Sequence, residues 1–200
     1  AALLERRFQL KVHEETEQVP VFGLTIATGG LKIKPVVADG VDANGFVRSG
    51  VKNQACDSLP PVEPGQPTST ASARSAEEVR RGAKPHCGLF GSQHGPNIVF
   101  VGGGVPLSSL AFAAATALGP PGRVTVLDQM NNTERFNFIL EFTPEEGAMR
   151  RGATPPEPSN IPPAPRIFAA LEEQLGLTLQ PTRAPREYIV IDSVQRLLPN

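Results

Sequence analysis

The chain has 200 residues, of which 40% are hydrophobic and 20% are charged, and its formal net charge is −1. This length fits one ordinary domain, or two small ones, with a packed core. A near-neutral chain without a basic stripe is not typical of nucleic-acid binders, and no apolar run reaches the roughly 18 residues of a membrane span. No secretory signal is visible, but AALLERRF begins inside a helical pattern, so we expect a mature product or part of a longer chain.

The first expected unit, at about residues 1–35, has the order helix, strand, strand. Leu4 and Phe8 lie at helical spacing. Leu10 and Val12 then alternate with polar residues, as in a strand with one buried face. The stretch VPVFGLTIA is the second expected strand, so the chain has to reverse its direction between the two strands.

The expected reversal falls on an acidic segment. Glu14, Glu15 and Glu17 are predicted to form a solvated hairpin turn, and His13 is predicted to end the strand before it, paired with Glu14, Glu15 or solvent. The sequence HEE resembles the start of a zinc-protease helix, but Glu17 stands where the second histidine is required. We therefore predict no metal site and no catalytic residue here.

Residues 57–85 and 143–165 are rich in proline and contain few large apolar side chains. Such segments bury too little apolar surface to offset the entropy lost on ordering, so both are predicted to be long solvated loops. Cys56 and Cys87 flank the first loop at a spacing that matches no zinc pattern. A disulfide is favoured over two unrelated buried thiols. It would stabilise the fold by about 3–4 kcal/mol and indicate an oxidising compartment.

The stretch NIVFVGGGVPLSSLAFAAATALGPPGRVTVLD, residues 97–128, has the outline of a dinucleotide-binding βαβ unit. In that interpretation Gly102 and Gly104 form the turn beside the phosphates, and Asp128 binds the ribose. Leu107 stands where the third glycine is needed for close packing of helix and strand. A plain structural turn at the glycines is therefore the favoured interpretation.

The structural interpretation places this stretch in a second helix–strand–strand unit, at about residues 97–142. RVTVLD and RFNFILEF are its two strands, expected to pair as a hairpin. Phe136, Phe138, Leu140 and Phe142 alternate cleanly with other residues, which makes RFNFILEF the clearest strand in the chain. A helix that covers a hairpin needs no nucleotide.

A third unit is expected at about residues 165–194. Pro165 suits the first turn of a helix, and Gly176 suits a left-handed cap at its end. LTL and EYIVID are then two strands separated by a turn at PTRAP, and the apolar positions of this unit match those of the first unit at an offset of 167 residues. Together the units predict a single α+β domain, residues 1–200, with three helix–strand–strand units on a largely antiparallel sheet.

Both ends of the chain resemble a soil-associated family of uncharacterised proteins that is expanded in acidobacterial genomes. The resemblance rests on LLERRFQLKVHEETEQVPVFGLTIATGGLKIKP and IFAALEEQLGLTLQPTRAPREYIVIDSVQRLLPN, and on HCGLFG, GVPLSSLA and RFNFILEFTPEE between them. It implies the C-terminal part of a longer, exported protein, which in some members stands beside a membrane metallopeptidase of the antibiotic-sensor type. No activity is established for the family, so no catalytic residue is transferred. VLDQMNNTERFNF also replaces the glycine-containing turn VDxTGLxGxYDF expected from the family.

Three functional hypotheses follow. The main one is a non-catalytic extracytoplasmic module, periplasmic or secreted, which binds an unknown protein or cell-envelope ligand in an interaction or sensory role. It needs no cofactor, metal, nucleic acid or membrane span. The alternative is a dinucleotide-binding enzyme that uses Gly102, Gly104 and Asp128. The third is an assembly role through an exposed sheet edge, because long antiparallel edges invite pairing.

Overall fold

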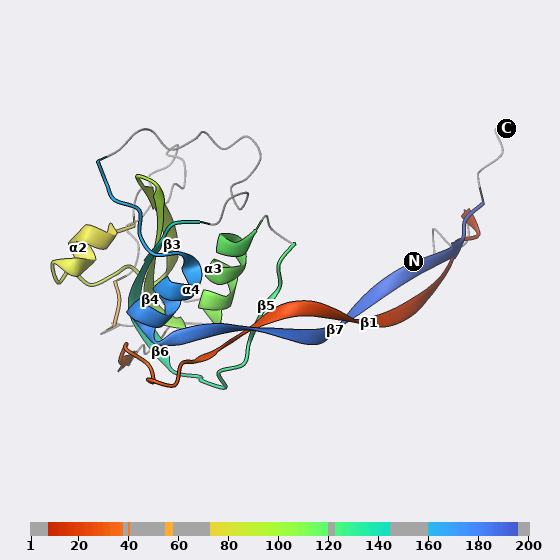
Figure 1. Cartoon of the computed structure of the whole chain (residues 1–200), viewed down its shortest axis with the longest axis horizontal. Coiled ribbons are helices and arrows are strands. Elements are labelled where there is room, and N and C mark those ends of the chain that lie inside the picture. Colours follow the sequence, from red (N-terminus) through yellow and green to blue (C-terminus); the bar gives the residue numbers. More distant parts are fainter. Residues whose placement is uncertain are drawn as a thin grey trace. The chain divides into compact units, whose positions relative to one another are not determined.

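The computed structural model describes residues 8–37, 40, 55–57, 73–119, 123–144 and 160–195. Contacts divide the chain into two compact units, one of Ala1–Val21 with Pro181–Asn200 and one of Phe22–Gln180. Figure 1 shows the elements of both. The helices and two sheets confirm the α+β class, and the single-domain organisation stays a prediction. The described helices include none long and apolar enough to cross a membrane.

The larger unit is built on a four-stranded antiparallel sheet with the strand order β2-β6-β4-β3. Its strands are β2 (Pro35–Val36), β3 (Gly88–His94), β4 (Asn97–Pro106) and β6 (Arg135–Phe142). The predicted alternation along β6 is confirmed, since Phe136, Phe138, Leu140 and Phe142 are buried and the residues between them are only partly buried. One face of β6 therefore belongs to the main hydrophobic core.

Two helical segments cover that face. They are α3 (Ser108–Leu118) and α4 (Ile167–Ala170), which continues as the π-helical turn η2 (Leu171–Leu175). Their large core-facing side chains are fully buried against β6, and burial of each such side chain contributes about 1.5–3 kcal/mol. Gly176 ends η2 at φ 73°, as predicted, and a Cβ there would meet Gly30 O at 2.1 Å.

The opposite face of the sheet carries a short helix and the segment with the two cysteines. Helix α2 (Ala76–Arg80) begins with a capping box between Ser75 and Glu78, and Ala76 packs on Val99 and Val101 of β4. This helix falls within the loop predicted at residues 57–85. The rest of that loop lies largely outside the described residues, as does most of residues 143–165.

The predicted hairpin of the middle unit is wrong. Strand β5 (Val126–Asp128) pairs in parallel with Phe22–Leu24 of β1, and β5 and β6 lie in different sheets. The connection between them redirects the chain, because Asn131 adopts φ 51° and the side chain of Asn132 accepts a hydrogen bond from Glu134 N. The helix–strand–strand order along the chain is therefore not a set of local hairpins.

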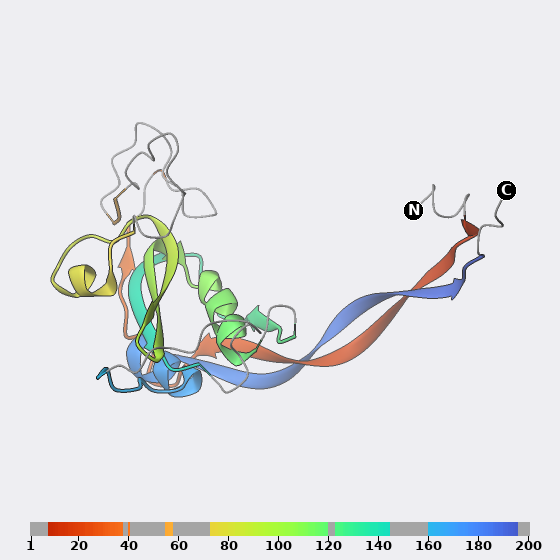
Figure 2. The same cartoon turned by 90° about the horizontal axis from the view of Figure 1, so that it is seen from above.

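The smaller unit holds most of two long strands, β1 (Lys11–Ile26) and β7 (Leu177–Ser193), which are neighbours in the sheet order β5-β1-β7. They run side by side in opposite directions as a two-stranded ribbon (Figure 1, Figure 2). The helix predicted around Leu4 lies outside the described residues.

Both turns predicted in these strands are wrong. Glu14, Glu15 and Glu17 lie inside β1 with exposed side chains, and His13 lies near its start, while residues 181–185 continue β7. The sequence pattern predicts that each strand pairs with a strand close by in sequence. Instead, β1 and β7 are neighbours, and they come from opposite ends of the chain. The prolines of PTRAP are tolerated because β7 is an edge strand.

A candidate binding site around Arg80 and Glu141

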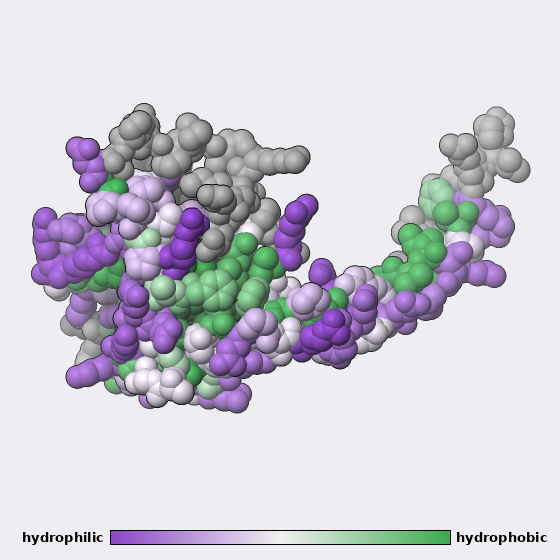
Figure 3. Space-filling view, in the orientation of Figure 1, coloured by the Kyte–Doolittle hydropathy of each residue, from purple (hydrophilic) through white to green (hydrophobic). Residues whose placement is uncertain are grey.

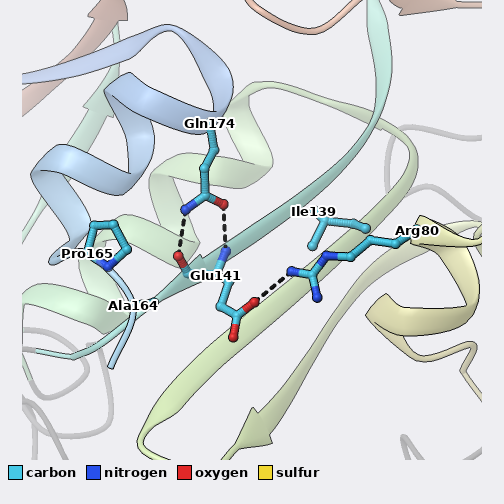
Figure 4. Close-up of a pocket in the computed structure, with 6 residues that line it drawn as sticks. All are labelled: Arg80, Ile139, Glu141, Ala164, Pro165 and Gln174. Atoms are coloured by element: carbon cyan, nitrogen blue, oxygen red, sulfur yellow. Dashed lines mark hydrogen bonds and ion pairs between the residues drawn. The ribbon is translucent and has the colours of Figure 1, made fainter. Parts of the chain in front are cut away.

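The candidate site is centred on Glu141, the only carboxylate of β6. Strand alternation places Glu141 opposite the core face, and its side chain is 17% exposed. Its Oε2 accepts a hydrogen bond from Arg80 Nη2 at 2.6 Å (Figure 4). Its Oε1 accepts one from Asn97 Nδ2 at 3.0 Å and lies 3.2 Å from His94 Nδ1. Three side chains from α2, β3 and β4 therefore converge on one carboxylate.

These contacts decide the charge of Glu141. Partial burial raises the pKa of Glu141, but the hydrogen bonds from Arg80, Asn97 and His94 together outweigh burial and lower the pKa below its ordinary value. Glu141 is therefore ionised at neutral pH. A carboxylate held in this state serves as a fixed negative charge and not as a proton donor.

Asn97 ties a distant segment to the site. Its side chain is buried, with the residue 2% exposed, and Nδ2 also donates to Pro162 O at 3.2 Å. Its Oδ1 accepts hydrogen bonds from Ala164 N at 2.8 Å and Thr143 Oγ1 at 3.0 Å. One amide thus positions the segment before α4 against the start of β4.

Gln174 of η2 completes the other side of the site. Its Nε2 donates to Glu141 O at 2.7 Å, and its Oε1 accepts from Glu141 N at 3.0 Å (Figure 4). Strand β2 pairs with β6 only at Phe136 and Arg135. The amide side chain therefore satisfies the backbone of β6 where no neighbouring strand of the described residues reaches.

Two cavities of about 480 Å³ each share Arg80 as a lining residue. The first lies among Arg80, Glu141 and Gln174, with the apolar side chains of Ile139 and Pro165 beside them (Figure 4). The second lies between α2 and strands β3 and β4, and its polar lining includes Ser75, Ser92, Gln93, His94 and Arg81.

Arg80 keeps guanidinium donors that no described residue takes up. A guanidinium carries five N–H donors, and the hydrogen bond from Nη2 to Glu141 uses one of them. The side chain of Arg80 is 43% exposed at the boundary of the two cavities. Its neighbour Arg81 is instead paired with Glu77 at 3.0 Å on the exposed surface of α2. Arg80 is thus a cation held in place by Glu141 and still able to bind an anionic group.

The glycine run of the sequence prediction serves packing inside a strand. Gly102 and Gly104 lie in β4, which continues through a register shift to Pro106, and Gly104 adopts φ 59°. A Cβ on Gly102 would come within 2.6 Å of the Phe138 ring. The amide of Gly104 donates to Asn137 Oδ1 at 2.8 Å, so it is already used within the protein.

Asp128 is not brought together with these glycines in a βαβ unit. It lies at the end of β5, in a different sheet from β4, and its Oδ1 accepts a hydrogen bond from Met130 N at 2.9 Å. The dinucleotide alternative therefore loses the parallel crossover geometry on which it depends.

Cys56 and Cys87 are joined in a buried disulfide. Next to it, Arg74 Nη1 donates to Asp57 Oδ2 at 2.5 Å, and the amide of Arg74 donates to Nδ1 of the buried His86 at 3.1 Å. Burial, and then the charge of Arg74, lowers the pKa of His86, so its ring is neutral at neutral pH. The cluster fastens the cysteine segment to the sheet.

His13 forms a separate cluster in the smaller unit. Its Nε2 lies 2.9 Å from Glu15 Oε1 and its Nδ1 lies 2.8 Å from Asp192 Oδ1. The hydrogen bonds to Glu15 and then to Asp192 raise the pKa of His13. Within the described part of the chain, no three histidine, cysteine or acidic residues form a group that could hold a metal ion.

The sequence prediction names none of the residues of the candidate site. Two sequence patterns point to some of them. The capping-box pattern Ser75-x-x-Glu78 marks the start of a helix that carries Arg80, and alternation in RFNFILEF places Glu141 on the face away from the phenylalanines. No local pattern connects either residue with Gln174.

No curated protein and no solved structure matches the chain. A family model does match it, over residues 1–194, and is described as a protein of unknown function (DUF3738). The expectation of an uncharacterised family is confirmed at this level. Since the match covers most of the chain, the protein belongs to the family of unknown function DUF3738.

Proposed function

We propose that the chain is a non-catalytic, extracytoplasmic binding module, and that it binds an extended acidic ligand, such as an acidic segment of a partner protein, at Arg80. The observation that carries this proposal is the position of Arg80 between two cavities, fixed by Glu141 and with donors that no described residue uses. A cation that is held in place before binding loses less side-chain entropy when a ligand arrives.

The lining of the cavities supports a carboxylate-bearing chain as the ligand. Arg80, with spare donors in a planar fork, suits bidentate binding of a carboxylate. Ile139 and Pro165 offer apolar contact on one side of Arg80, and Ser92 and Gln93 offer hydrogen-bonding groups on the other. A ligand that passes over Arg80 meets both sides, which favours an extended molecule over a compact one.

Two further observations support the non-catalytic part of the proposal. Glu141 has four polar neighbours and a lowered pKa, whereas an efficient general acid or base at neutral pH needs a pKa near 7. His86 is buried, and its Nδ1 is committed to the amide of Arg74. Both groups hold structure in place.

The disulfide supports the extracytoplasmic part. Disulfides persist in oxidising compartments and are rare in the cytosol. Cys56 and Cys87 are joined and buried, as in a structural disulfide. A fusion of the chain with its natural upstream sequence to a reporter active only outside the cytoplasm tests this location directly, and a silent reporter on a well-expressed fusion would contradict it.

The binding proposal is tested by calorimetry with an oligo-glutamate peptide and an oligo-lysine peptide of equal length. The wild-type chain is expected to bind the acidic peptide alone. Arg80→Gln should weaken that binding by about tenfold or more, because a hydrogen bond to a charged group contributes about 1.5–3 kcal/mol.

Arg123→Gln is the matched control. It removes the same charge from an exposed residue that lines neither of the two cavities. It should leave the affinity within about twofold, the change expected from a distant surface charge. Equal loss in the two variants would show a general charge effect, and an unchanged affinity in Arg80→Gln would place the ligand elsewhere.

A further inference from the structure

The outer edge of β7 has no neighbouring strand among the described residues, because β7 ends the sheet order β5-β1-β7. This edge includes the segment REYIVIDS, residues 186–193, which is rich in the β-branched and aromatic residues that favour strands. Ile189 is 72% exposed and Ile191 is 62% exposed. Figure 3 shows hydrophobic surface on the ribbon that β1 and β7 form.

The prolines indicate which backbone groups face this open edge. Successive residues of a strand direct their N–H and C=O groups to alternate edges. Pro181 and Pro185 have no N–H, and a proline in a sheet is tolerated where that position faces solvent. Glu187, Ile189 and Ile191 lie at even spacings from the two prolines along the strand. We therefore assign the backbone donors and acceptors of these three residues to the open edge.

Backbone hydrogen bonds at the two ends of the ribbon bear on this assignment. Gly176 alternates with the set that contains the two prolines, so its C=O should face β1. It does, because it accepts a hydrogen bond from Ala27 N. Gln195 lies at an even spacing from the prolines, yet its N–H donates to Phe8 O, on the side of β1. Gln195, however, lies beyond the end of β7. Val194 and Gln195 are not in strand conformation, so the alternation of β7 does not have to extend to Gln195. The alternation set by the prolines therefore applies within β7.

The side chains of this segment complement one another in an antiparallel pairing of two copies. When two β7 strands pair about a twofold axis at Ile189, Arg186 of each copy lies opposite Asp192 of the other. Arg186 contacts Tyr188 by a cation–π interaction at 5.6 Å. Asp192 accepts from His13 through Oδ1. The guanidinium donors of Arg186 and the Oδ2 of Asp192 make no hydrogen bond to another described residue.

We propose that two copies of this chain associate through the β7 edge, with Ile189 at the twofold axis and two Arg186–Asp192 pairs across the interface. Two ribbons then form one four-stranded antiparallel sheet. The interface pairs the backbone groups of Glu187, Ile189 and Ile191, and it brings the exposed isoleucines of the two copies together. Cross-strand pairs of opposite charge and of β-branched residues are the contacts that stabilise such a sheet.

Charge selects this register and this edge. A shift that centres the axis on Val190 sets Arg186 opposite Val194 and Asp192 opposite Tyr188, so both charge pairs are lost. The edge of β1 away from β7, which has no neighbouring strand among the described residues before Phe22, is unsuited to self-pairing, because Glu14, Glu15 and Glu17 of both copies would gather at one interface. Like charges brought together across a sheet are destabilising.

The test is sedimentation equilibrium of the 200-residue chain across a range of concentrations at low salt. The wild-type chain is expected to dimerise. Arg186→Asp sets aspartates opposite each other twice, and Asp192→Arg sets arginines opposite each other twice. Each variant should raise the dimer dissociation constant by about tenfold or more.

An equimolar mixture of the two variants gives the decisive result. In the mixed dimer, the aspartate introduced at position 186 of one copy meets the arginine introduced at position 192 of the other. The native Asp192 likewise meets the native Arg186, so both charge pairs are restored. The mixture should dimerise about as tightly as the wild type, which also shows that both variants are folded. Arg183→Asp is the matched control, since Arg183 lies on the same strand and meets no charge in this register.

Three outcomes would overturn the proposal. A wild-type chain that stays monomeric at all concentrations has no such interface. A mixture that fails to restore association excludes this register, and equal weakening by Arg183→Asp reduces the effect to net charge. None of these outcomes bears on ligand binding at Arg80, so the two proposals fail separately.

Discussion

Gln174 and Glu141 are joined as two neighbouring strands would be, although Gln174 uses its side chain and Glu141 its backbone. Nε2 of Gln174 donates to the carbonyl of Glu141 at 2.7 Å, and Oε1 accepts from its amide at 3.0 Å. The pair fastens η2 to the exposed edge of β6. It also fixes the backbone from which the carboxylate of Glu141 reaches Arg80.

Gln174→Leu is therefore expected to destabilise the fold. It leaves the partly buried N–H and C=O of Glu141 without partners, and an unsatisfied buried group costs about 1–3 kcal/mol. Urea unfolding of the two proteins measures the difference. Gln93→Leu is the control, since Gln93 is exposed and its side chain donates to Gly95 O, two residues away. Equal stability of Gln174→Leu and the wild type would contradict the role of the amide.

Asn97→Ala is expected to release the segment before α4. Asn97 bonds Ala164 N, Pro162 O and Thr143 Oγ1 as well as Glu141, and its loss should cost at least about 2 kcal/mol. Hydrogen exchange provides the local readout: the amide of Ala164 should exchange faster in the variant, relative to amides in α3. Uniform acceleration in both places would indicate global destabilisation instead.

Reduction of the disulfide is expected to lower the free energy of unfolding by about 3–4 kcal/mol, the value for a loop of this size. The loop between Cys56 and Cys87 spans 31 residues in sequence separation. Guanidine unfolding with and without reductant measures the loss. Intact mass after alkylation should show no modified thiol before reduction and two afterwards. Two reactive thiols in the unreduced protein would contradict the disulfide and the compartment proposed from it.

Stability should fall in acid through Glu141. Its pKa in the folded protein is lowered from 4.5, so its ionised form contributes stability that is fully present above pH 4.5 and is lost as the pH falls through the folded pKa. Glu141→Gln should remove this part of the pH dependence below pH 4.5 while leaving that of other groups. Parallel pH profiles for the variant and the wild type would show that the pKa of Glu141 is not lowered.

Nucleotides should not stabilise the chain. A ligand at 100 times its dissociation constant stabilises a protein by about 2.7 kcal/mol, which thermal unfolding detects readily. We expect no shift with NAD, NADP, FAD or ATP, because Gly104 N and Asp128 Oδ1 are bonded within the protein. A clear shift with a dinucleotide, abolished by Gly104→Val, would restore the enzyme alternative.

The sequence predicts the parts of the fold that depend on neighbouring residues. The alternation in RFNFILEF is a property of β6 alone, and the left-handed cap at Gly176 depends on the residues around it. The disulfide can also be predicted from the sequence, because Cys56 and Cys87 are the only cysteines in the chain.

Local patterns fail where the partner of a segment is distant. Pro181 and Pro185 are typical of a turn, although an edge strand also accepts proline. The candidate site escapes prediction for the same reason. Arg80, Glu141 and Gln174 come from α2, β6 and η2, and only the packing of these elements brings them together. No spacing pattern in the sequence predicts that these three residues lie close together.

The neighbour relation of β1 and β7 has a consequence for how the molecule is made. The chain is synthesised from its N-terminus, and the outer part of β1 finds its partner only when Pro181–Ser193 has been added. Pairings between such distant residues form slowly. A nascent chain on the ribosome therefore carries β1 with an unpaired edge until residues 181–193 have been made. Its exposed acidic side chains, Glu14, Glu15 and Glu17, are expected to disfavour pairing between neighbouring nascent chains along that strand in the meantime.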